Sequence, residues 1–187
     1  MQFPVSKDQG DFVSGTVVSL NSDGVLSKQS GTTVYKNQHI FERMMVDSQA
    51  ISLASDIFVV VYHGHVAAIK LGAHDQVIEE KLFELPTGQI GKQRDVDCAI
   101  RVPNTNVILV LGNMEVIPVH IEYNNPGFYY EYGDPTLYYF SPLDLRPSIT
   151  VDGNRFAILF TDNDYFTRLM TGTIDVESLT VTMTTDN

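Results

Sequence analysis

A short apolar run recurs three times in this sequence at nearly constant spacing. It reads IFVVVY at 57–62, NVILVLGN at 106–113 and RFAILFTD at 155–162. Phe58, Ile108 and Phe156 occupy equivalent positions, and their numbers differ by 50 and then by 48. Continuous runs of branched and aromatic residues between turn residues are typical of strands that are buried on both faces. A period of about 50 residues indicates a repeat protein.

Turn residues divide each repeat into four short strands. The segments predicted as the third strand of each unit also align with one another. They read GTVVSL at 15–20, VAAIKL at 66–71, VIPVHI at 116–121 and GTIDVE at 172–177. The first copy has a hairpin signal, Asp23-Gly24, but no apolar run, so it supplies an outer hairpin alone. We expect one repeat domain over 1–187, with units at 12–36 (outer hairpin only), 48–86, 95–140 and 146–185.

The four-stranded units predict an all-β fold. Apolar inner strands with more polar outer strands are typical of propeller blades stacked face to face. Over residues 15–184 the chain resembles β-propeller repeat proteins, and the predicted fold is an array of four-stranded antiparallel units, three complete and one partial. The alternative is a β-sandwich. FVVVYHG at 58–64 and RFAILFTDND at 155–164 look like the aromatic-rich repeats of large extracellular or cell-surface propellers. That resemblance implies an extracellular or surface location and an adhesive or structural role.

The number of units limits how the ring could close. Propellers close with four or more blades, whereas this chain supplies three complete units. The missing strands would come from a longer polypeptide or from a partner, unless the units form an irregular four-bladed ring or a sandwich. Because open sheet edges and apolar faces are normally covered, we expect association with a further copy or another chain. A stable monomer in light scattering at high concentration would contradict this expectation.

Charge and composition exclude several classes of function. The formal net charge is −11, with 23 acidic and 12 basic residues, which argues against nucleic acid or an anionic membrane surface as partner. No run approaches the roughly 18 apolar residues of a membrane span. Cys98 is the single cysteine, so it forms no internal disulfide, and its apolar strand predicts a buried, inert thiol. Asp95 and Asp97 could pair as glycosidase carboxylates, but such pairs are common at strand ends. We expect no enzymatic activity and no cofactor.

Two groups of residues are candidates for metal binding. His63, His65 and His74, with Asp75 beside them, form the one histidine cluster and would suit zinc or nickel. The competing interpretation is a polar turn that contains histidine, which is the more frequent case. Asp162, Asn163 and Asp164, with Asp175, could offer oxygen ligands to calcium. A hydrophilic loop is favoured there, because the further acidic ligand and glycine of an EF-hand loop are absent.

A tyrosine-rich stretch is the candidate interaction surface. FYYEYGDPTLYYF at 128–140 contains five tyrosines, namely Tyr129, Tyr130, Tyr132, Tyr138 and Tyr139. Tyrosine offers a large apolar area with a polar tip, which suits a protein interface or a carbohydrate platform. The alternative is aromatic pairing across strands on a half-buried face. Protein contact is favoured over sugar because the chain has no tryptophan.

The sequence thus favours a non-catalytic structural or protein-interaction module within a larger extracellular or surface assembly. Its expected partner is a protein or further copies of the chain that complete the propeller. The alternative is a carbohydrate-binding or carbohydrate-active propeller, with a glycan as ligand.

Overall fold

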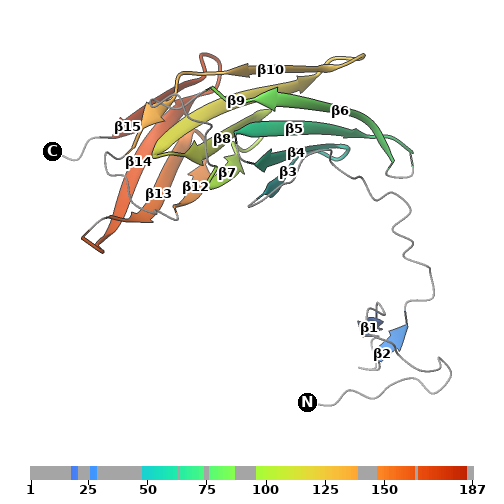
Figure 1. The fold of residues 1–187 in the computed structure, drawn as a ribbon, viewed down its shortest axis with the longest axis horizontal. Helices are drawn as coiled ribbons and strands as arrows, with labels where there is room; N and C mark the ends of the chain where they lie inside the picture. Colours follow the sequence, from blue (N-terminus) through green and yellow to red (C-terminus); the bar gives the residue numbers. More distant parts are fainter. Residues whose placement is uncertain are drawn as a thin grey trace. The chain divides into compact units, whose positions relative to one another are not determined.

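Within the described residues, backbone pairing forms three antiparallel sheets of four consecutive strands, one of which has a short fifth strand, and a two-stranded hairpin (Figure 1). The computed structural model describes residues 18–20, 26–28, 48–62, 64–73, 76–86, 96–138, 147–162 and 164–184. The chain divides into two compact units, Met1–Ile40 and Phe41–Asn187. In the first unit, β1 (Val18–Leu20) pairs antiparallel with β2 (Leu26–Lys28).

The second unit contains the three sheets. Sheet I consists of β3 (Gln49–Ala54), β4 (Ile57–Tyr62), β5 (His65–Leu71) and β6 (Val77–Glu84). Sheet II consists of β7 (Cys98–Arg101), β8 (Val107–Gly112), β9 (Glu115–Tyr123) and β10 (Phe128–Tyr132), with β11 (Thr136–Leu137) as a further short partner of β9. Sheet III consists of β12 (Ser148–Asp152), β13 (Arg155–Thr161), β14 (Thr167–Asp175) and β15 (Thr180–Thr184).

Among the described strands, each sheet is made from consecutive strands in chain order, and none of these strands is exchanged between sheets. The all-β class and the repeated four-stranded antiparallel units are therefore confirmed. The three recurring apolar runs become β4, β8 and β13, which are the second strands of the three sheets. Within the described residues, the sheets do not close into a ring or a barrel.

Sheet II lies between the other two sheets, as Figure 1 shows. All six residues of β8 are buried. Ile108 and Val110 belong to a core cluster shared with sheet I, where they join Val59 and Val66. The alternate residues of β8 belong to a second cluster shared with sheet III, which contains Val107, Leu109, Leu111, Phe156, Ile158 and Ile174. This alternation follows from the period of two in a strand, which directs successive side chains to opposite faces.

The first strands of the three sheets lie beside one another. β7 contacts both β3 and β12. The side chain of Gln49 in β3 accepts a hydrogen bond at Oε1 from the backbone N–H of Ala99 in β7, at 2.8 Å. This bond satisfies an edge-strand amide that would otherwise be open to another chain. The guanidinium of Arg101 also donates to the carbonyl of Ser52, at 3.4 Å.

The prediction that every recurring run is buried on both faces is wrong for β13. Its residues alternate, with Phe156, Ile158 and Phe160 buried and Arg155 and Leu159 exposed. The physical reason is that the inner face of sheet III packs on sheet II, while its outer face is open to solvent. β14 also begins at Thr167, earlier than the sequence predicts, so that strand includes residues expected to form a loop.

A glycine in β14 fits an aromatic ring in β13. Gly172 and Phe156 are direct partners in the register of the two strands. A Cβ atom at Gly172 would lie 2.4 Å from Cζ of the Phe156 ring, so the absence of a side chain leaves the space that the ring occupies.

The part of the chain that the structure describes contains no apolar helix of the length that a membrane span requires.

Candidate functional site

Four exposed apolar side chains gather at one end of the β13–β14 pair. Tyr165 is 89% exposed, Phe166 61%, Leu169 59% and Leu159 46%. Leu159 and Leu169 are direct cross-strand partners, and the two aromatic residues lie in the connection between the strands. We call this group the apolar tip. Clusters of exposed large apolar residues are uncommon on soluble proteins and often mark a contact surface.

A buried carboxylate holds the connection that carries the tip. Asp162 is 4% exposed. Its Oδ1 accepts hydrogen bonds from the backbone N–H groups of Asp164, at 3.0 Å, and Phe166, at 2.9 Å. Its Oδ2 accepts from Nε of Arg168 at 2.6 Å. Burial by itself would raise the pKa of Asp162, but the Arg168 guanidinium and the two backbone amides outweigh it and lower this pKa below its usual value.

The apolar tip is unfavourable in free energy for two reasons, its backbone conformation and the exposure of its apolar side chains. Tyr165 adopts a positive φ of 64°, in the left-handed region that residues with a Cβ atom seldom occupy. Strained backbone that persists in a folded protein is often held there by surrounding contacts for a function. Here the contacts are those of Asp162. The loop therefore has a defined conformation that directs its aromatic residues to solvent.

The rest of the outer face of sheet III is rich in hydroxyl groups. All eight threonines of this face are exposed, and we call the set the hydroxyl face: Thr150, Thr161, Thr167, Thr171, Thr173, Thr180, Thr182 and Thr184. The register aligns them across strands, with Thr171 opposite Thr184 and Thr173 opposite Thr182. The face of sheet III that points away from sheet II is thus polar apart from Ala157 and the leucine pair of the tip.

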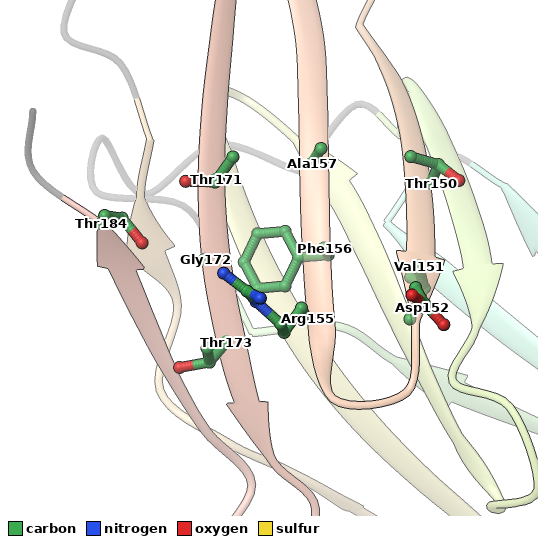
Figure 2. A pocket seen from close by; sticks show the side chains of 10 residues that line it. All are labelled: Thr150, Val151, Asp152, Arg155, Phe156, Ala157, Thr171, Gly172, Thr173 and Thr184. Atoms are coloured by element: carbon green, nitrogen blue, oxygen red, sulfur yellow. The ribbon is translucent and has the colours of Figure 1, made fainter.

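A shallow hollow lies within the hydroxyl face (Figure 2). Its volume is about 310 Å³, and it lies around Ala157, whose small side chain separates Thr150 from Thr171. The side chains of the surrounding outer-face residues form its wall: Thr150, Asp152, Arg155, Thr171, Thr173 and Thr184. Figure 2 shows the Arg155 side chain extending from β13 toward Gly172 of β14, whereas Asp152 stands on β12.

The structure divides the five predicted interface tyrosines. Tyr129 is 71% exposed and Tyr132 is 44% exposed on β10. Tyr130 stacks on Phe83 of sheet I, with ring centroids 4.4 Å apart, and donates a hydrogen bond to the carbonyl of Glu84 at 2.6 Å. Burial, followed by the neighbouring Tyr132 and Glu84, raises the pKa of Tyr130 to about 12. Tyr139 lies outside the described residues.

Tyr138 belongs to the core between sheets II and III. It is 3% exposed and meets the ring of Phe160 edge to face, with centroids 5.6 Å apart. Its hydroxyl has no hydrogen-bond partner among the described residues. Burial raises its pKa, with smaller contributions from Asp97 and Cys98. Of the described tyrosines in the stretch, Tyr129 and Tyr132 are therefore the two that present an exposed ring.

Of the three candidate metal-binding histidines, the structure describes one. His65 is buried, stacks on Tyr62 with centroids 5.6 Å apart, and places Nε2 3.7 Å from Oε1 of Glu84. His63 and His74 lie outside the described residues, as does Asp75. Within the described part of the chain, no group of three or more histidine, cysteine or acidic residues is placed to hold a metal. Asp162 and Asp164 are joined by the loop hydrogen bond given above, and Asn163 also lies outside that part.

The single cysteine is half-buried in β7. Burial, and then the charge of Asp97, raise the pKa of the Cys98 thiol to about 11, although a backbone hydrogen bond involving Ile149 acts in the opposite direction. The thiol is therefore protonated at neutral pH, and a protonated thiol is a poor nucleophile. Asp97 is exposed, and its candidate glycosidase partner Asp95 lies outside the described residues.

The chain is an all-β protein with repeated four-stranded antiparallel sheets, and the outer face of sheet III carries the apolar tip and the hydroxyl face. Comparison with family models, with curated proteins and with solved structures found no match. Sequence reasoning missed the apolar tip because TDNDYFTRLM has the composition of a polar loop. The adjacent aromatic pair Tyr165-Phe166 within that polar segment is the signal that could have identified it.

Proposed function

We propose that this chain is a non-catalytic protein-interaction module and that the apolar tip is its contact surface. The observation that carries the proposal is the Asp162 network, because a buried carboxylate and its ion pair hold a strained loop, with a left-handed tyrosine, in which two aromatic rings are exposed. Preorganised aromatic residues are the typical anchors of protein interfaces, since little further ordering is needed on binding.

The repeat architecture supports a role within a larger assembly. The first strands of the three sheets lie next to one another, as the inner strands of propeller blades do. We therefore propose a propeller-type arrangement, completed by a protein partner or by further copies, and an extracellular or surface location. The two open regions of sheet III favour a partner that packs an apolar pocket on the tip and hydrogen-bonds to neighbouring threonines.

Site-specific photo-crosslinking tests the contact surface. A benzophenone amino acid is placed at position 165 of the full chain, in place of Tyr165. After irradiation in an extract of the cells that produce the chain, we expect one defined adduct with a single protein. Tyr129 is the matched control, because it is also an exposed tyrosine but lies on β10 of sheet II. Adducts at Tyr129 alone, or at neither position, would overturn the assignment of the tip.

Affinity measurements with the crosslinked partner give the second test. Phe166→Ser removes an exposed ring without emptying the core, and we expect it to weaken binding by about 2 kcal/mol or more, as for an interface hot spot. Tyr129→Ser is expected to leave the affinity unchanged. Circular dichroism of both variants checks that each retains its β-sheet signal.

A further inference from the structure

The hollow around Ala157 is large enough to hold a small molecule, and it lies on the open outer face of sheet III. Its volume of about 310 Å³ is at the lower end of the range for small-molecule sites. The hollow exists because alanine stands between longer neighbours: Arg155 and Leu159 flank it along β13, and Thr150 and Thr171 flank it on the adjacent strands. A larger residue at 157 would fill this space.

Two opposite charges face each other across the register without pairing. Asp152 and Arg155 are direct cross-strand partners, and both are exposed. Opposite charges in this position commonly contact each other, but among the described residues these two form no ion pair. Figure 2 explains this separation, because the Arg155 side chain extends toward β14 and away from Asp152. The guanidinium and the carboxylate therefore stand on different sides of the hollow.

The hydrogen-bonding groups of the hollow are of mixed type. Asp152 offers acceptors and Arg155 offers donors, while each threonine hydroxyl can act as either. The methyl groups of Ala157 and of the threonines add apolar area between these polar groups. The opposite charges of Asp152 and Arg155 offset each other, so a charged ligand gains no net attraction there, and an apolar ligand would leave the polar groups without partners. A single carboxylate is also a poor donor set for a hard cation.

We propose that this hollow binds a neutral sugar ring. A pyranose carries hydroxyl groups around its rim, each a donor and an acceptor, and C–H groups on its faces. The rim fits Asp152, Arg155 and the threonine hydroxyls, and a C–H face fits the methyl group of Ala157. The site is distinct from the apolar tip, so sugar binding and protein binding can be tested separately.

Nuclear magnetic resonance titration of the full chain with the methyl glycosides of glucose, galactose, mannose and N-acetylglucosamine tests the proposal. At millimolar sugar we expect saturable shifts of the backbone amides of Ala157 and Thr171. The methyl glycoside of glucuronic acid should bind less tightly than that of glucose, because its carboxylate loses hydration while the opposite charges of Asp152 and Arg155 offset each other. The absence of saturable shifts with all four neutral sugars would overturn the proposal.

Variants locate the binding within the hollow. Ala157→Leu is expected to abolish binding, since it fills the space, and Leu159 on the same face shows that the strand accepts an exposed leucine. Thr171→Val keeps the shape but removes one hydroxyl and should weaken binding about threefold to tenfold. Thr167→Val, on the same face but outside the hollow, is the matched control and should bind like the original chain. Undiminished binding by Ala157→Leu would also overturn the proposal.

Discussion

Asp162 shows how a single residue can organise a surface. The sequence suggests a hydrophilic loop at this position, with calcium binding as the alternative. In the structure both carboxylate oxygens are already used, one by two backbone amides and the other by Arg168. The residue is a structural centre of the loop, and its effect on function would come through the two aromatic residues that the loop presents.

The charge of Asp162 predicts how the tip responds to pH. Its folded pKa is lowered, so the ionised carboxylate stabilises the loop above the ordinary aspartate pKa of about 4, and this contribution is lost as the pH falls through the folded value. We expect the protection of the Asp164 and Phe166 amides from hydrogen exchange, measured against their intrinsic rates at the same pH, to fall in this acidic range. In Asp162→Asn these amides should lack the acid-dependent change, since no carboxylate titrates there. Identical acid profiles for the original chain and this variant would contradict the prediction.

Among the elements, the three recurring strands differ in burial although their sequences are similar. β8 is buried along its whole length, β4 is partly exposed on the face that points away from sheet II, and β13 alternates. Period and composition could predict that these segments are strands. They could not predict burial on both faces, because burial depends on which sheets cover each face.

The difference between β8 and β4 can be tested with matched substitutions. Val110 is fully buried, whereas Val60 is half-buried on the outer face of sheet I. Val110→Asp places an unpaired charge between two sheets, and we expect it to lower the free energy of unfolding by more than about 4 kcal/mol. Val60→Asp should have a smaller effect, because water can still reach its side chain. Urea unfolding followed by circular dichroism measures both, and equal losses would contradict the assignment of the faces.

Strand boundaries could be predicted from the sequence where turn residues clearly mark the ends of a strand. The predicted strand at 57–62 agrees with β4, and the aligned segments at 66–71 and 116–121 lie within β5 and β9. β14 was predicted too short because its first residues, such as Arg168 and Leu169, are exposed and lack an apolar alternation. β11 has two residues and is defined by its pairing with β9, so no local sequence pattern specifies it. The exposed tip was missed for a related reason, since local composition does not show exposure.

At the scale of the whole molecule, sheet II is the shared layer of two cores. One cluster joins it to sheet I and the other joins it to sheet III. The outer face of sheet III, in contrast, carries the hydroxyl face. Any partner that meets sheet III there would contact threonines and the apolar tip, and would not continue the apolar core.

Removing sheet III tests the dependence of sheet II on both neighbours. A chain that ends at residue 138 would expose Val107, Leu109 and Leu111, which are buried in the complete chain. Exposed apolar faces of this kind promote association. We expect the shortened chain to form larger species than the complete chain at equal concentration in light scattering. A shortened chain of the same oligomeric state as the complete one would contradict the layered core.

The consecutive order of strands within each sheet has a consequence for how such a protein can change over time. Since none of the strands that the structure describes is shared between sheets, one continuous stretch of gene encodes each of these layers. Duplication or deletion of such a stretch changes the number of sheets without altering the path of the chain through the remaining sheets. The number of layers in such an array can therefore change in steps of one sheet, and the hydroxyl face and the apolar tip of sheet III would be copied or lost together.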